Sequence, residues 1–70
     1  MKDNIFGVKL KALRIEKGLS QRKLGEVFGV CNQTVSFWET ERFEPNISQI
    51  IKLCHFFEVE SDFLLGLKDY

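Results

Sequence analysis

The sequence predicts an all-α fold, organised around two short helices that are joined by a glycine turn. Between Gln21 and Trp38, apolar residues recur at helical spacing on both sides of Gly29, which is typical of a helix-turn-helix unit. No part of the 70-residue chain shows the alternating pattern of a strand, and the chain contains one proline. We expect a single domain over residues 1–70.

A first helix is expected at the start of the chain. The side chain of Asn4 can cap it, and it should end at Gly18. Its core face is marked by apolar residues at positions i, i+4 and i+7, namely Phe6, Leu10 and Leu13.

The first helix of the central unit should begin at Gln21, because Ser20 is a good N-cap. Leu24 and Phe28 lie four residues apart and therefore share one face. The helix should end at Gly29, since the left-handed conformation after a helix is least costly for glycine.

The second helix of the unit is expected from about Asn32 to Thr40. Its core face is supplied by Val35 and Trp38, three residues apart. Gly25 lies on the surface that this helix must approach, where a larger side chain would hold the backbones apart.

Two further helices complete the prediction. Asn46 and Gln49 form a capping-box pattern for a fourth helix, and a short fifth helix should run from Ser61 to Leu65 and stop at Gly66. The core face of the fourth helix should hold Ile50, Leu53 and Phe57, with Cys54 beside them.

Composition excludes several classes of protein. No apolar run approaches the roughly 18 residues that a membrane helix needs, and the N-terminus lacks the uninterrupted apolar core of a signal peptide, so we expect a soluble, cytoplasmic protein. Cys31 and Cys54 lack metal-type spacing and should stay reduced, so neither zinc nor a disulfide is expected. With one histidine and no phosphate-binding glycine loop, the sequence indicates neither an enzyme, nor a cofactor, nor a small-molecule substrate.

The charges are unevenly distributed although their sum is zero. Residues 1–24 hold seven basic and two acidic side chains, and residues 25–70 hold three basic and eight acidic ones, so the two parts carry +5 and −5. This asymmetry favours a polar partner for the N-terminal part, although ordinary solvated helix faces also explain most charge runs.

The helix from Asn32 to Thr40 has two different sides. At 100° per residue, Cys31, Thr34, Val35 and Trp38 gather towards the core, whereas Asn32, Gln33, Ser36, Phe37 and Thr40 gather on the other side. That outer side carries no charge. Asn and Gln pair with adenine in the DNA major groove, and an apolar side chain can contact the thymine methyl group. Asn32, Gln33, Ser36 and Phe37 therefore outline a candidate base-reading surface.

Eight positions of the central unit resemble, one by one, the helix-turn-helix of the phage-repressor and Cro family of bacterial regulators, often called Xre-like. They are Gln21, Leu24, Gly25, Phe28, Gly29, Val30, Val35 and Trp38. The resemblance extends to KALRIEKGLSQ before the unit, to Trp38-Glu39 and Glu44-Pro45, and to SDFLLG near the end. It implies a compact five-helix, lambda-repressor-like domain that binds double-stranded DNA.

The resemblance also implies roles for single residues. Matching the family residue by residue puts base contacts at Asn32, Gln33 and Phe37, and we add Ser36 to the expected contacts. An ion pair between Arg14 and Glu39 should tie the first helix to the unit, and Ser20 and Gln21 should contact phosphate at a helix start. Further phosphate contacts are expected at and after the end of the recognition helix, the helix from Asn32 to Thr40. The full set of expected phosphate contacts is Ser20, Gln21, Thr40, Arg42 and Asn46.

Three features depart from the family pattern. Phe37 replaces a residue that is usually polar or basic, and it either contacts a thymine or belongs to a protein-binding patch. Cys31 replaces a Ser or Thr N-cap and is either a weak cap or an oxidation switch. The connection after Thr40 carries Glu41 and Glu44 where basic residues are common, which should weaken binding to phosphates.

The C-terminus has more apolar surface than a small core should absorb, and the family often dimerises through this region. We therefore expect a homodimer that uses Phe56, Phe63, Leu64, Leu67 and Tyr70. The function that follows is a transcriptional repressor bound as a dimer to an inverted repeat. The alternative is a protein-interaction module, such as an antitoxin or anti-repressor. This alternative is favoured by the neutral net charge, by the acidic connection and by the aromatic residues Phe37 and Phe43.

Overall fold

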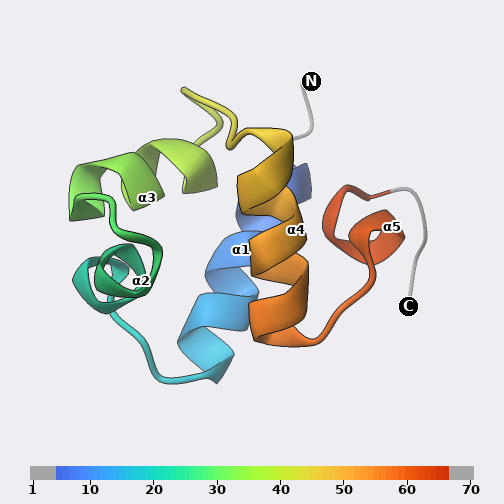
Figure 1. Cartoon of the computed structure of the whole chain (residues 1–70), viewed down its shortest axis with the longest axis horizontal. Helices are drawn as coiled ribbons and strands as arrows, with labels where there is room; N and C mark the ends of the chain where they lie inside the picture. Colours follow the sequence, from blue (N-terminus) through green and yellow to red (C-terminus); the bar gives the residue numbers. More distant parts are fainter. Residues whose placement is uncertain (1–4, 67–70) are drawn as a thin grey trace.

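The computed structural model describes residues 5–66, which form five helices and no strand. They are α1 (Ile5–Glu16), α2 (Gln21–Phe28), α3 (Asn32–Glu39), α4 (Ile47–Phe57) and α5 (Ser61–Leu64). In Figure 1, α2 and α3 lie together on one side of the molecule, α5 lies on the opposite side, and α1 and α4 occupy the middle. The predicted all-α fold, with a helix-turn-helix formed by the second and third helices, is confirmed.

The ends of the helices follow from local hydrogen bonding. The Ser20 hydroxyl accepts a bond from the Lys23 backbone N–H at 3.0 Å and so caps α2, and Gly29 ends that helix in the left-handed conformation with φ +72°. Asn46 and Gln49 form both bonds of the capping box at the start of α4, at 2.8 and 2.9 Å. Asn4, the expected cap of α1, lies outside the described residues.

Two residues other than glycine adopt the left-handed conformation within residues 5–66. Glu41 follows the C-cap of α3 and Glu58 is the C-cap of α4, and both have φ +58°. This conformation brings the side chain of an L-residue close to its own backbone, so both turns carry strain that glycine would avoid.

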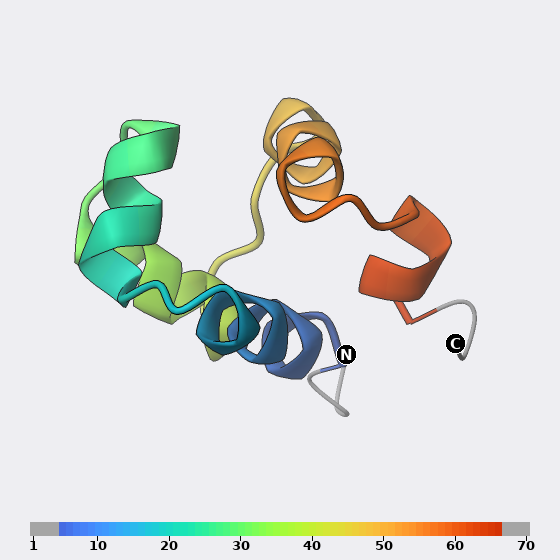
Figure 2. The same cartoon turned by 90° about the horizontal axis from the view of Figure 1, so that it is seen from below.

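Every helix contributes to the core. In Figure 2, α1 and α4 again occupy the middle, between α2 on one side and α5 on the other. The fully or almost fully buried apolar residues are Leu10, Leu24, Val35, Trp38, Leu53, Phe57 and Leu64. The Phe28 ring makes edge-to-face contacts with Trp38 and with Phe56, each with ring centroids 6.0 Å apart. Aromatic contacts therefore join α2 to both α3 and α4.

The expected dimerisation patch needs a correction at Leu64. Its side chain has no exposed surface because α5 folds back and buries it in the core, so it cannot contact a partner. Phe56 and Phe63 are half-buried, and the Lys9 ammonium lies 4.3 Å above the Phe63 ring. Leu67 and Tyr70 lie outside the described residues.

None of the helices in residues 5–66 has the length and apolar character to cross a membrane; the longest, α1, has 12 residues.

Candidate nucleic-acid interface

The turn between α2 and α3 lies directly against α2, and Gly25 allows this approach. A Cβ atom at Gly25 would lie 2.6 Å from the carbonyl oxygen of Val30 and 3.3 Å from the carbonyl carbon of Cys31. The Val30 backbone N–H donates to the Gly25 carbonyl oxygen at 2.9 Å. The small residue was expected to accommodate the second helix itself; the structure shows that it accommodates the turn that precedes it.

The two sides of α3 differ as the sequence predicts. Val35 and Trp38 are buried, whereas Asn32 and Gln33 are exposed at the start of the helix. Ser36, also expected to contact bases, is half-buried. Cys31, Asn32 and Gln33 together form the exposed entrance to α3, so the expectation that Cys31 faces the core was wrong.

A buried hydrogen-bond network fixes α3 to the rest of the molecule. The Arg14 guanidinium donates from Nε to Glu39 Oε2 at 2.6 Å, from Nη2 to Glu39 Oε1 at 3.2 Å, and from Nη1 to the Leu19 carbonyl oxygen at 2.7 Å. Arg14 is 8% exposed and Glu39 6%. The ion pair that the family resemblance implies is therefore present, and it joins α1 to the C-terminal end of α3.

Gln21 belongs to the same network. Its side-chain amide donates from Nε2 to Glu39 Oε1 at 3.0 Å, so the side chain points towards the ion pair. From the sequence, Gln21 was assigned to phosphate binding and this contact was missed, because its geometry depends on the packing of α2 against α3. The backbone N–H of Gln21 remains in the first turn of α2, where N–H groups have no partner within the helix.

The start of α2 also carries positive charge. Arg22 and Lys23 are exposed, and both lie near Glu26, at 3.7 and 3.5 Å. Exposed pairs of this kind are weak, so both cations remain available to a stronger anionic partner.

The connection 40–46 folds back across the end of α3. The Thr40 hydroxyl donates to the Ser36 carbonyl oxygen at 3.0 Å, and the Arg42 backbone N–H donates to the Phe37 carbonyl oxygen at 2.9 Å. The rings of Phe37 and Phe43 meet edge to face, with centroids 5.0 Å apart. The Arg42 guanidinium carbon lies 5.6 Å from the centroid of the Phe37 ring. Arg42 and Phe43 therefore both contact the ring of Phe37.

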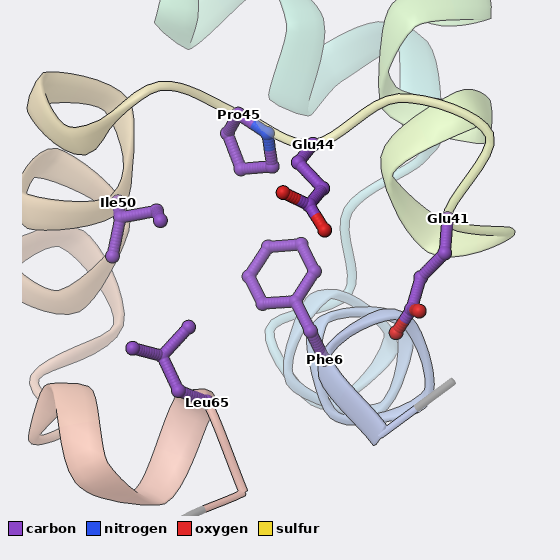
Figure 3. A pocket seen from close by; sticks show the side chains of 6 residues that line it. All are labelled: Phe6, Glu41, Glu44, Pro45, Ile50 and Leu65. Atoms are coloured by element: carbon purple, nitrogen blue, oxygen red, sulfur yellow. The ribbon is translucent and has the colours of Figure 1, made fainter. Parts of the chain in front are cut away.

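Glu41 and Glu44, the two acidic residues of the connection, face a different part of the molecule from the Phe37 ring. Together with Pro45, residues of α1 and α4, and the residue that follows α5, they line a cavity of about 180 Å³ (Figure 3). The Glu41 carboxylate accepts a bond from the Gly7 backbone N–H at 3.4 Å, in the first turn of α1, and the Glu44 carboxylate points towards the Phe6 ring. The lining residues are Phe6, Glu41, Glu44, Pro45, Ile50 and Leu65.

The two cysteines have different surroundings. Cys31 caps α3 without a side-chain cap bond, and its thiol lies 3.3 Å from the Thr34 hydroxyl, a hydrogen bond that lowers the pKa of Cys31. Cys54 is half-buried beside the core, and this burial raises the pKa of its thiol. Within residues 5–66, no three His, Cys, Asp or Glu side chains are grouped to hold a metal ion.

A protein-family model described as Helix-turn-helix matches residues 10–64, which include the whole of α2 through α5. The chain belongs to the helix-turn-helix family.

Two curated relatives in Bacillus subtilis (strain 168) cover 87% of the chain, over 61 residues. The chain is 34% identical to the SPbeta prophage-derived HTH-type transcriptional regulator YonR and spans 56% of its length. It is 36% identical to the HTH-type transcriptional regulator YgzD and spans 92% of its length. The names of these family members describe regulators of transcription rather than enzymes.

A solved structure has the same fold. The chain superposes on the P22 c2 repressor protein, crystallised in complex with a synthetic operator, with a TM-score of 0.78 and 30% sequence identity. The match covers 86% of this chain and 91% of the repressor chain in that crystal. The helix arrangement of this chain therefore resembles that of a repressor crystallised with a synthetic operator.

Proposed function

We propose that the protein is a sequence-specific DNA-binding regulator of transcription, acting as a repressor, with α3 lying in the major groove. The observation that carries this proposal is the contrast between the two sides of α3. Val35 and Trp38 anchor the helix in the core, while Asn32 and Gln33 expose uncharged amides at its start. In a helix-turn-helix, the N-terminal residues of the second helix are the ones that contact base edges.

The proposed base contacts follow from side-chain chemistry. Asn32 and Gln33 each present a donor and an acceptor, which suits paired hydrogen bonds to N6 and N7 of adenine. Ser36 lies one turn further along and adds a hydroxyl. Phe37 presents an apolar ring, which suits the methyl group of thymine.

The proposed phosphate contacts lie on both sides of α3. The N-terminus of α2, capped by Ser20, offers the backbone N–H of Gln21 and the positive end of the helix dipole. Beyond α3, Arg42 supplies a cation, and the side-chain NH₂ group of Asn46 can donate to phosphate while its amide oxygen accepts from the Gln49 backbone N–H. The Thr40 hydroxyl would turn from Ser36 towards phosphate.

We also propose that the protein acts as a dimer on an inverted repeat, with half-sites whose centres are about 10 base pairs, or roughly 34 Å, apart. After the correction at Leu64, the partly exposed Phe56 and Phe63 are the described candidates for the dimer contact. A regulator that acts on DNA in a bacterial or phage-infected cell would work in the cytoplasm.

A second candidate function, binding to another protein as an antitoxin or anti-repressor, is favoured by one observation. Phe43 is 61% exposed and its ring packs against that of Phe37, and such an apolar surface does not attract phosphate. The exposed cations Arg22 and Lys23 and the neutral face of α3 favour DNA over this alternative.

Selection from a random DNA pool separates the two functions. The purified protein is first tested for retention on heparin and is then incubated with random duplexes at low salt. The bound duplexes are recovered and sequenced over several rounds. We expect enrichment of an inverted repeat, and loss of that enrichment in the double variant Asn32→Ala, Gln33→Ala. A protein that enriches no sequence at low salt would contradict the DNA-binding proposal and favour the protein-binding one.

A further inference from the structure

The ring of Phe43 lies beside the proposed recognition surface but outside α3. Phe43 belongs to the connection between α3 and α4 and is 61% exposed, although it is one of the largest apolar side chains. Its neighbour Phe37 is half-buried, and neither ring belongs to the hydrophobic core. The two rings therefore form a separate aromatic pair at the C-terminal end of the recognition helix.

Two residues of the connection contact the side chain of Phe37. The rings of Phe37 and Phe43 are 5.0 Å apart at an interplanar angle of 83°, an arrangement that aromatic rings prefer. The guanidinium of Arg42 contacts the same Phe37 ring, and the Arg42 backbone N–H is bonded to the Phe37 carbonyl oxygen at 2.9 Å. Contacts from two successive residues thus restrict the orientation of the Phe37 side chain.

We infer that Phe43 is a positioning and specificity-determining residue. It orients the Phe37 ring against a thymine methyl group and shields this ring–methyl contact from solvent. This inference rests on the proposed DNA-binding function. DNA suits the pair better than an apolar protein surface does, because Arg42 beside the rings is exposed and suits a phosphate, while α3 presents uncharged amides. The site is a thymine-containing step in each half-site.

Replacing thymine by uracil tests this inference, because uracil differs only by the missing methyl group. Duplexes with the selected operator are made with one thymine at a time changed to uracil, and dissociation constants are measured by fluorescence anisotropy. For the wild type we expect one thymine in each half-site whose replacement weakens binding about fourfold, the effect of losing one buried methyl group. In Phe43→Ala the same replacement should change the dissociation constant less than about twofold.

Two further variants separate positioning from general packing. Phe37→Ala should abolish the thymine-to-uracil difference at the same position, and the double variant should add nothing to it. Ile47→Ala is the matched control, because Ile47 is a 75% exposed apolar residue at the start of α4, outside the ring pair. It should keep the wild-type difference. Thermal unfolding of each variant establishes that it is folded, and Phe43→Leu replaces Phe43→Ala if the latter is not.

The outcomes distinguish the inference from the proposed function. If Phe43→Ala binds the operator and keeps the full thymine-to-uracil difference, the inference is wrong and DNA binding still stands. If the difference is lost in Phe37→Ala alone, Phe37 reads the methyl group without help and the inference is also wrong. If the wild type prefers no duplex, the proposed function fails with it, and the exposed rings are better explained by a protein partner.

Discussion

A single hydrogen atom in place of a methyl group at Gly25 decides how closely the turn approaches α2. We expect Gly25→Ala to destabilise the protein by about 1–3 kcal/mol, because the new methyl group would meet the carbonyl oxygen of Val30 at 2.6 Å. Alanine normally stabilises a helix by about 1 kcal/mol relative to glycine, so the predicted sign is opposite to helix propensity. Urea unfolding followed by circular dichroism measures the change.

Gly29→Ala is the matched control for that prediction. Gly29 has φ +72°, and no neighbouring atom lies within 4 Å of the position that its Cβ atom would take. Only the left-handed backbone conformation is therefore penalised, by about 1–2 kcal/mol. If Gly25→Ala proved as stable as the wild type, the close approach of the turn to α2 would be wrong.

Glu58 offers a prediction of the opposite sign. It ends α4 with φ +58°, a conformation that glycine adopts without strain, so Glu58→Gly should stabilise the protein by about 1 kcal/mol. For a domain of this size, that corresponds to a rise in the midpoint of thermal unfolding of about 4–8 °C. Glu58→Ala removes the same charge from the helix C-terminus but keeps the strain. An equal gain in both variants would contradict the conformational explanation.

Features that depend on residues close together in the sequence were predictable. The left-handed turn at Gly29 and the capping box of Asn46 and Gln49 depend on local hydrogen bonds, and both were predicted. The bond from Gln21 to Glu39 and the contact between Phe37 and Phe43 join residues on different elements, and spacing along the chain did not reveal either.

At the scale of the elements, the buried network of Arg14, Gln21 and Glu39 fixes α3 against α1 and α2. Arg14→Met should leave the Glu39 carboxylate buried without its main partner and should cost about 3–5 kcal/mol of the free energy of unfolding. The double variant Arg14→Met, Glu39→Leu should recover most of that loss, because no unpaired charge remains buried. Chemical denaturation of the two variants provides the comparison.

Arg22→Met provides a control on an exposed ion pair. Arg22 lies 3.7 Å from Glu26 with its side chain 83% exposed, so its loss should change stability by less than about 1 kcal/mol. A loss in Arg14→Met no larger than that in Arg22→Met would show that the network does not hold α3.

The connection between α3 and α4 is the element that should limit DNA affinity. Replacing Glu44 by Gln removes a negative charge two residues along the chain from each of the proposed phosphate contacts Arg42 and Asn46, although the carboxylate itself points towards Phe6. We expect Glu44→Gln to bind the operator a few-fold more tightly at low salt, and this gain should shrink as salt screens the charge. Anisotropy titrations at several salt concentrations measure it.

Glu58→Gln is the control for the Glu44→Gln prediction. Glu58 lies at the other end of α4, which has 11 residues and is therefore about 16 Å long. This separation exceeds the Debye length at physiological salt, so the charge of Glu58 is largely screened at the connection. The same gain in both variants would indicate an effect of net charge alone, and no gain in Glu44→Gln would place the connection away from the DNA backbone.

For the whole molecule, the arrangement of helices was predictable because each apolar face has a clear helical spacing. All five helices were expected near their observed positions, and the family match over residues 10–64 agrees with the resemblance noted from the motif. The C-terminus was less predictable. Apolar residues there were assigned to a dimer contact, but Leu64 completes the core, since spacing alone does not tell a buried face from a partner-binding face.

The central claim, that the exposed start of α3 reads bases, is tested most directly by one ratio. Dissociation constants of the wild type and of Asn32→Ala, Gln33→Ala are measured on the selected operator and on a scrambled duplex. We expect the double substitution to reduce the ratio of specific to non-specific affinity by at least about tenfold, while affinity for the scrambled duplex and stability stay nearly unchanged. An unchanged ratio in a folded double variant would contradict the account.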